Sequence, residues 1–365
     1  MPKRKLAQSA AAAVHPDTAP TAVTLGTDFS GLDGVCFALQ RLGVRFEHVF
    51  SAETDKAARK FIRHAHQPRL LEGDVRCRDY DTEGKAPPAV KLYVAGPPCQ
   101  PFSPAGGRDG FSDVRGMLLW NAIDYIVSRR PVAVLLENTD RLQLEEGLEV
   151  ICGILTDAGY SWKWMILNTM DYGVPQSRRR IYLQAVLSAE LRQPLRFPPP
   201  LCQKDIAPLS TFLTKSSPPP VAVLPEHQAH ARRVQSEMEK HAERGLNPFE
   251  TGLCIDCGSS DKWVGSAVEH AMTLTKSRCQ DFGHWLTSQG RYLDLDDYSK
   301  LQGYDPDMLD FAGAGVKRTQ GAAMLGNAVS LNILEFVLPE LLHSAGLISS
   351  SEYETAKTRV KRRWT

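Results

Sequence analysis

The 365-residue chain lacks several features that would place it in a specialised class of protein. No apolar run reaches about 18 residues, the length that a membrane-spanning helix needs, so no membrane partner is expected. The eight cysteines form no dense framework, which argues against a small disulfide-stabilised fold and favours reduced thiols in an intracellular protein. The formal net charge is only +1, so a surface for a polyanion would have to be local.

The first 20 residues carry no acidic side chain before Asp17 and begin with the basic cluster Pro2-Lys3-Arg4-Lys5. Such a cluster is typical of a nuclear import signal, so we expect a nuclear location in a eukaryote and a cytoplasmic or nucleoid location otherwise. A disordered, solvated start and an organelle transit peptide are the alternatives.

Short apolar runs alternate with amphipathic stretches from residue 22 to about residue 190. Repeated strand and helix patterns predict an α/β fold, a doubly wound and mostly parallel sheet with helices on both faces. The expected strands are 22–29, 47–52, 91–95, 131–136, 162–167 and 180–186, and the expected helices are 32–42, a helix from 55, 114–128 and 146–158.

The amino-acid composition changes after residue 190. Residues 194–225 hold nine prolines and therefore cannot form a regular helix or central strand. This segment is expected to lead into a smaller, loop-rich domain, and helical patterns return at 296–301 and 320–342. The expected divisions are a disordered basic tail (1–20), the first part of the main domain (21–190), the smaller domain (191–290), the closing part of the main domain (291–347) and a basic C-terminal tail (348–365).

A turn suited to a ligand follows the first expected strand. Glycines allow the backbone to bend tightly and approach a ligand, and the first strand-to-helix turn of an open sheet is where such ligands bind. Glu53 and Asp74 come at the ends of the next two strands, where carboxylates can accept hydrogen bonds from ribose hydroxyls and an adenine amino group. A plain tight turn with ordinary surface acids is the alternative. The residues of the turn are Asp28, Phe29, Ser30, Gly31, Leu32, Asp33 and Gly34.

Cys99 lies just past an expected strand end in the segment Gly96-Pro97-Pro98-Cys99-Gln100-Pro101-Phe102-Ser103. A cysteine in a stiff loop at that place is suited to act as a nucleophile if its surroundings favour the thiolate. Glu137-Asn138 ends the apolar strand 131–136, which directs a carboxyl group into the same crevice. A nucleophile beside an acid suits addition to a cytosine ring.

Arg178 and Arg180 are alternate residues, so on a strand they can share one face and bind a base carbonyl and a phosphate. A solvated basic edge is the alternative.

Taken together and in this order, the motifs of residues 22–345 resemble those of the cytosine-C5 DNA methyltransferase family. The matching segments, besides the turn at 28–34, are Pro98-Cys99-Gln100 with Phe102-Ser103, Arg115-Gly116-Met117-Leu118, Glu137-Asn138, Asp171-Tyr172-Gly173-Val174-Pro175-Gln176 with Arg178 and Arg180, Leu301-Gln302-Gly303-Tyr304, and Gly326-Asn327-Ala328-Val329. The resemblance implies a class I methyltransferase-like sheet, with a target recognition domain near 191–290.

The resemblance also implies the site. S-adenosylmethionine is the expected cofactor, and DNA, with its cytosine flipped from the duplex, is the expected substrate. The implied cofactor residues are Asp28, Phe29, Ser30, Gly31, Leu32, Gly34, Glu53, Asp74, Val75, Gly96, Pro98, Leu118, Asn327, Ala328 and Val329. The implied catalytic residues are Cys99, Glu137, Asn138, Arg178 and Arg180, with Gln100 and Ser103 as substrate contacts.

The chain departs from the family's pattern at three places. Asp33 replaces the second glycine of the usual first motif, which leaves the geometry of that turn open. Thr139 replaces the valine that usually follows Glu-Asn. Leu295 and the segment 297–299 stand where a threonine and a glutamate usually precede Leu-Gln-Gly, a region that supports structure more than chemistry.

Alternatives of other classes are a tRNA cytosine methyltransferase, a catalytically inactive DNA-binding relative, and an adenosylmethionine enzyme acting on a small molecule. The Cys-Phe-Thr tripeptide typical of the tRNA-directed branch is absent, which favours DNA. The presence of Cys99, Glu137 and both arginines disfavours an inactive relative. Small-molecule enzymes share the sheet but not the nucleophile loop.

Four side chains of the smaller domain could together make a zinc site, namely Cys254, Cys257, Cys279 and His284. The spacing of the second pair is unremarkable, so reduced structural cysteines are preferred and no metal is expected. The sequence predicts no particular oligomeric state.

Overall fold

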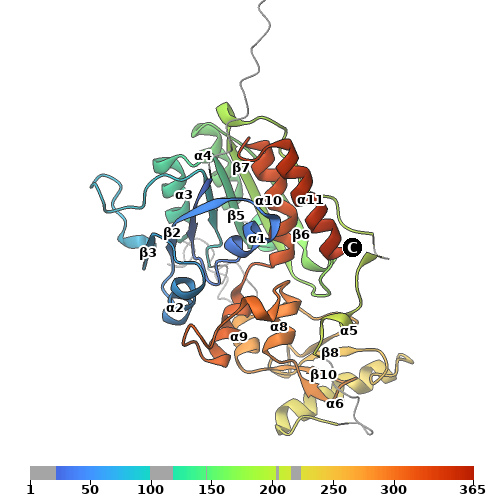
Figure 1. Ribbon diagram of the computed structural model, residues 1–365. Coiled ribbons are helices and arrows are strands. Elements are labelled where there is room, and N and C mark those ends of the chain that lie inside the picture. Colours follow the sequence, from blue (N-terminus) through green and yellow to red (C-terminus); the bar gives the residue numbers. More distant parts are fainter. Residues whose placement is uncertain (1–21, 99–117, 145, 203–204, 215–222) are drawn as a thin grey trace, which may run out of the picture.

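The computed structural model describes residues 22–98, 118–144, 146–202, 205–214 and 223–365. Its main body is a seven-stranded sheet in the order β3-β2-β1-β4-β5-β7-β6, with a smaller domain below it in the view of Figure 1. The strands are β1 (Val23–Asp28), β2 (Phe46–Ala52), β3 (Leu70–Glu72), β4 (Leu92–Ala95), β5 (Ala133–Thr139), β6 (Tyr160–Asn168) and β7 (Arg179–Leu187). The doubly wound α/β fold expected from the sequence is confirmed.

Five of the seven strands are parallel neighbours, and β7 runs antiparallel to both β5 and β6. The carboxyl ends of the parallel strands β1, β2, β4 and β5 therefore meet at one edge of the sheet. All of the predicted strands between 22 and 190 are present, with ends that differ by a few residues.

Helices cover both faces of this sheet (Figure 1). One face packs against α1 (Gly34–Leu42), α2 (Lys56–Ala65) and α10 (Leu331–Ser344). The other packs against α3 (Leu118–Arg129) and α4 (Glu146–Asp157), whose apolar side chains form a separate cluster. Because both faces are buried, strands such as β4 are apolar throughout rather than alternating.

The predicted single helix at 320–342 is wrong, because the structure has two helices there that meet at a bend of 45°. They are α9 (Arg318–Asn327) and α10, and Ala328 between them is extended (φ −66°, ψ 151°). The carbonyls at the break are satisfied by side chains instead of helical N–H groups: Arg178 donates to Ala328 O and the Tyr304 hydroxyl to Val329 O. The break brings the Gly-Asn-Ala-Val segment to the carboxyl edge of the sheet.

The smaller domain is built on a four-stranded antiparallel sheet in the order β11-β10-β8-β9. Its strands are β8 (Leu253–Asp256), β9 (Gly265–Val268), β10 (His284–Leu286) and β11 (Arg291–Tyr292). This part of the chain also contains the long helix α6 (Gln228–Ala242) and the short helices α5 (Leu209–Phe212), α7 (Lys276–Gln280) and α8 (Leu295–Leu301). The predicted boundary at residue 290 falls two residues too early, since Tyr292 pairs with Trp285 of β10.

Residues 348–365 are not the tail that the sequence suggested. They form α11 (Ser350–Trp364), which begins with a capping box at Ser349 and packs on the main core through Ala356, Val360 and Trp364. Within the described part of the chain no single helix is long and apolar enough to cross a membrane, and only the bent pair α9–α10 meets the length and composition of a span.

Candidate active site

The turn after β1 adopts the unusual backbone that its glycines suggested. Phe29, Gly31 and Asp33 all have φ near +55°, a left-handed conformation that costs least for glycine. Ser30 ties the turn to the end of β2, because its N–H and its hydroxyl both donate to Ala52 O at 3.1 and 3.2 Å. Gly34 begins α1 with no room for a side chain, since a Cβ would lie 2.3 Å from the Tyr304 hydroxyl.

A buried polar network holds Asp33 in this conformation. Its carboxylate accepts hydrogen bonds from the Ser51 hydroxyl at 2.6 Å and the Thr27 hydroxyl at 3.2 Å. His48 Nε2 lies 3.3 Å from the same oxygen, and the Cys36 thiol bonds to the other ring nitrogen of His48 at 3.4 Å. Burial alone would raise the pKa of Asp33, but its hydrogen bond to His48 and the charge of that ring outweigh burial and lower it. These contacts thus stabilise a left-handed backbone at Asp33, the position where the usual first motif has a glycine.

Glu53, at the end of β2, lies against the same turn. Its carboxylate accepts a hydrogen bond from the N–H of Gly31 and another from the N–H of Asp55, each at 2.8 Å. Arg59 of α2 donates to the carbonyls of Glu53 and Glu72 and so joins the ends of β2 and β3. Glu53 is partly exposed, so its remaining lone pairs face the open edge of the sheet.

Asp74 follows β3 at the predicted place and is half-buried, with its side chain 27% exposed. It caps the short helix at Val75 by accepting from the N–H of Arg76, and the Arg76 guanidinium binds the same carboxylate. Those contacts with Arg76 hold the pKa of Asp74 below its usual range, so the group is a carboxylate that can accept further hydrogen bonds.

Asp28 is the predicted cofactor residue whose side chain points away from the edge. It is buried in a bidentate pair with Arg78 at 2.6 Å and also accepts from the Tyr93 hydroxyl at 2.5 Å. Arg78 in turn binds Glu72, so ion pairs link the ends of β1 and β3, and the Tyr93 hydroxyl adds β4 to this network. Any contact of Asp28 with a cofactor would come from its backbone. No periodicity or motif in the sequence pointed to Arg78.

Cys99, Gln100 and Ser103 lie outside the described residues, but the chain that leads to them is placed. Gly96 follows β4 at the carboxyl edge, and a Cβ there would lie 3.5 Å from Glu137 Oε2 and 3.8 Å from Val329 Cγ2. Asn138 donates from its side-chain amide to Pro97 O at 3.4 Å. The stem of the cysteine loop, the Glu-Asn pair and the Gly-Asn-Ala-Val segment therefore converge.

Glu137 and Arg180 face each other across neighbouring antiparallel strands. Arg180 Nε lies 3.3 Å from Glu137 Oε1, and the two side chains are 14% and 12% exposed. The pair is thus largely shielded from solvent yet reachable from the edge. It offers a carboxyl group and a guanidinium side by side, as expected from the positions of both residues at strand ends.

Arg178, which the sequence pattern paired with Arg180, is buried and has different partners from Arg180. Residue 178 precedes β7, and its buried guanidinium donates to Leu274 O at 2.8 Å and to Ala328 O at 2.9 Å. It joins the smaller domain to the Gly-Asn-Ala-Val segment. Gln176, to which no role was assigned from the sequence, is fully buried and bonds to Leu301 O and the N–H of Leu274.

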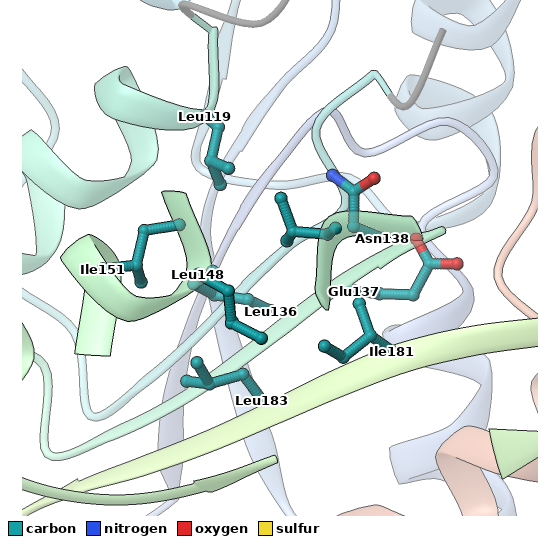
Figure 2. A pocket seen from close by; sticks show the side chains of 9 residues that line it. Leu119, Leu136, Glu137, Asn138, Leu148, Ile151, Ile181 and Leu183 are labelled. Carbon is teal, nitrogen blue, oxygen red and sulfur yellow. The ribbon is translucent and has the colours of Figure 1, made fainter. Parts of the chain in front are cut away.

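A small apolar cavity lies behind Glu137 and Asn138, with the two polar side chains at one end and leucine and isoleucine side chains around the rest (Figure 2). Its volume of about 10 Å³ has room for roughly one water molecule. The cavity is therefore part of the packing that fixes the end of β5 and is too small for a base.

The remaining candidate cofactor residues have the following places in the fold. Leu32 and Val75 are buried beside the turn and Asp74, Pro98 follows Gly96, and Leu118 begins α3. Asn327 ends α9 at the break before α10.

The zinc alternative in the smaller domain finds no support in the geometry. Among the described residues, ligand atoms of three His, Cys, Asp or Glu side chains gather only at Asp33, Cys36 and His48. The Cys257 thiol instead donates to Gly283 O at 2.9 Å. Burial lowers the pKa of His284 to about 3, which keeps that ring neutral beside the Tyr298 hydroxyl.

Comparison with known proteins shows which family the sequence matches. The family model described as C-5 cytosine-specific DNA methylase matches residues 28–343. Type II methyltransferase M.NlaX of Neisseria lactamica is 34% identical over 178 residues, which are 48% of this chain and 55% of that protein. The chain thus spans only about half the length of this relative.

Type II methyltransferase M.HaeII of Haemophilus aegyptius aligns over a longer region, with 26% identity over 335 residues that cover 89% of this chain and 95% of that protein. Among solved structures, the Entamoeba histolytica methyltransferase EhMeth superposes with a TM-score of 0.62 at 17% identity and covers 88% of this chain and 98% of its own. At that identity the likeness concerns the fold alone.

Proposed function

The chain belongs to the C-5 cytosine-specific DNA methylase family, and from this premise we propose that it transfers a methyl group from S-adenosylmethionine to C5 of cytosine in DNA. The transfer proceeds through a covalent bond between the Cys99 sulfur and C6 of the base. The observation that carries this proposal is the convergence of Gly96, Glu137 and Val329 at one edge of the sheet. Gly96, three residues before Cys99 in the sequence, thus lies beside Glu137 of the Glu137–Arg180 pair, which supports Cys99 as the nucleophile.

Cytosine C5 is a poor nucleophile because its ring is aromatic, and addition of the Cys99 thiolate at C6 makes C5 an enamine carbon. Glu137 hydrogen-bonds or protonates N3, so that the ring can accept the electron pair. Arg180 donates to O2. C5 then takes the methyl group, a bound water removes the C5 proton, and the Cys99 sulfur leaves by elimination.

The cofactor half of the site fits an adenosine group. Glu53 and Asp74 present carboxylates at the ends of β2 and β3, where they can accept from the ribose hydroxyls and the adenine amino group. Phe29, partly buried at positive φ, packs against the same group. S-adenosylmethionine supplies the methyl group as an electrophilic sulfonium.

DNA containing 5-fluorocytosine tests the covalent step, because fluorine at C5 cannot leave as a proton and the enzyme stays attached. Wild type with S-adenosylmethionine is expected to form a complex that resists denaturation. Cys99→Ala should form none, and Glu137→Gln should form it slowly. Gel electrophoresis follows the complex, and mass spectrometry maps the cysteine.

Cys77→Ala and Cys202→Ala are matched controls, since both thiols are exposed and neither side chain is assigned a role in the proposed site. Both variants should form the complex at the wild-type rate. An adduct that maps to any cysteine other than Cys99 would remove Cys99 from the mechanism.

Glu53→Ala tests the cofactor half of the site. The N–H groups of Gly31 and Asp55 lose their acceptor, and affinity for S-adenosylmethionine should fall by about 1–3 kcal/mol. Calorimetry measures the change, with Glu47→Ala as the control because Glu47 lies on the same strand but pairs with exposed Arg69. Equal affinities for wild type and Glu53→Ala would exclude this role.

The family description names DNA, and nothing in the described site favours tRNA, so DNA is the proposed substrate. The two sequence relatives named above, from Neisseria lactamica and Haemophilus aegyptius, are bacterial, which supports a cytoplasmic or nucleoid location rather than a nuclear one. The basic cluster on which the nuclear prediction rested lies outside the described residues. Residues 191–292, with the small sheet, are proposed to read the target sequence.

A further inference from the structure

A second pocket, of about 330 Å³, opens between α1, α10 and α11. The last turns of α11 supply more than half of its lining, and α11 lies beyond residue 343, where the match to the family model ends. The pocket is thus built largely from a segment that the family match does not include. Its lining residues are Arg41, Leu42, Glu335, Arg359, Val360, Arg362 and Arg363.

The charge of this lining is strongly positive, with four guanidinium groups and one carboxylate. That carboxylate is already engaged, because Glu335 accepts from Arg41 at 2.8 Å and from the Trp364 indole at 2.6 Å. Asp305, just outside the lining, accepts from Arg41 at 2.8 Å and from Arg363 at 2.5 Å. The ion pairs of Glu335 and Asp305 are therefore made with Arg41 and Arg363.

Arg359 and Arg362 carry the excess charge. Over the described residues, neither has a carboxylate within ion-pair distance, and Arg359 makes only a long hydrogen bond of 3.4 Å to Arg41 O. Arg41 is held in place by its ion pairs, yet its Nε is buried without an acceptor. Arg359 and Arg362 are exposed, with open donors beside the anchored Arg41, and such guanidinium groups favour bidentate binding of a tetrahedral oxyanion.

We propose that this pocket binds a phosphate group, with Arg359 and Arg362 as its principal donors. The phosphate belongs either to the backbone of bound DNA or to a free phosphate compound, and the chemistry of recognition is the same for both. The DNA source rests on the function proposed above. Binding of a free phosphate compound does not depend on that function, so the phosphate site and the proposed function can be tested separately.

Inorganic pyrophosphate is the probe for the first arm, measured by calorimetry on the full chain at low salt. Wild type should bind it, and Arg359→Gln/Arg362→Gln should bind at least about ten-fold more weakly because two charge-assisted contacts are lost. The control is Lys357→Gln/Lys361→Gln, which removes the same charge from the same helix at positions that do not line the pocket. It should bind within about two-fold of wild type.

The second arm measures affinity for a DNA duplex against salt concentration. If backbone phosphates occupy the pocket, Arg359→Gln/Arg362→Gln should lower the slope of log affinity against log salt by about 2 relative to the control. A difference between the two double variants in either arm supports the site and identifies its source. Equal behaviour of the two double variants in both arms would overturn it, and methyl transfer by wild type reports separately on the proposed function.

Discussion

Asp33 stands where the family that the chain resembles has a glycine, and the structure explains how an acid is accommodated there. A left-handed backbone costs a non-glycine residue about 1–2 kcal/mol. The Asp33 carboxylate offsets that cost by accepting from Ser51 and Thr27 and by pairing with His48. The sequence showed the substitution but not its partners, because Ser51 and His48 come from β2, a different strand.

Asp33→Ala should destabilise the fold by about 3 kcal/mol, since it leaves three buried polar partners without their acceptor. Asp33→Gly should lose about 1 kcal/mol less, because glycine adopts the left-handed backbone freely. Urea unfolding at pH 7 measures both. If Asp33→Ala were as stable as wild type, the network would have no role in stability.

The stability difference between wild type and Asp33→Ala should depend on pH. The pKa of Asp33 is lowered in the folded protein, so its contribution is present above the unfolded value of about 3.9 and is lost as pH falls through the folded pKa. The stability difference between wild type and Asp33→Ala should therefore be constant near neutrality and shrink below about pH 4.

At the scale of elements, local pattern predicted most of the sheet but not the contacts made far along the chain. Strands such as β4 and β5 are apolar runs of the right length, and they were identified within a few residues. The break after Asn327 was missed because its cause is distant: Arg178 and Tyr304 bind the carbonyls at 328 and 329. The turn residues, Glu137 and Arg180 were proposed from motifs, whereas the partners of Asp28 and Arg178 are distant in the sequence and no local pattern reveals them.

The helix α11 was missed for a different reason. Its basic composition suggested a tail, although Tyr353, Ala356, Val360 and Trp364 have the spacing of one helical face. Trp364 is 8% exposed and donates its indole N–H to Glu335.

Trp364→Ala should destabilise the protein by about 3–5 kcal/mol, because it removes a large buried side chain. Trp364→Phe keeps most of the apolar surface and should lose only about 1–3 kcal/mol with the hydrogen bond to Glu335. Thermal unfolding of both variants, with Thr365→Ala as the exposed neighbour, checks this order. A solvated tail would give no change in any of the three.

At the scale of the whole molecule, the proposed site lies at the sheet edge that faces the smaller domain in Figure 1. A cytosine stacked inside a duplex cannot reach the Glu137–Arg180 pair, so it must be flipped out at a cost of a few kcal/mol. A mispaired target cytosine has already lost part of its pairing energy.

Duplexes with a mispaired target should therefore bind more tightly than paired ones, and both should bind more weakly as salt rises. The target is first located by bisulfite sequencing of methylated DNA, and fluorescence anisotropy then compares the two duplexes. A duplex of the same length without the target is the control and should show no effect of mispairing at the same position. Equal affinity for paired and mispaired targets would argue against flipping.

The face of the central strands that Val23 and Leu25 present is covered in part by α10 and α11, the last helices of the chain. During synthesis these strands leave the ribosome on the order of tens of seconds before those helices do. Until then a broad apolar surface of the nascent protein has no covering partner of its own. The amino-terminal half is therefore incompletely covered until α10 and α11 have been synthesised, and the core closes only when those helices pack on it.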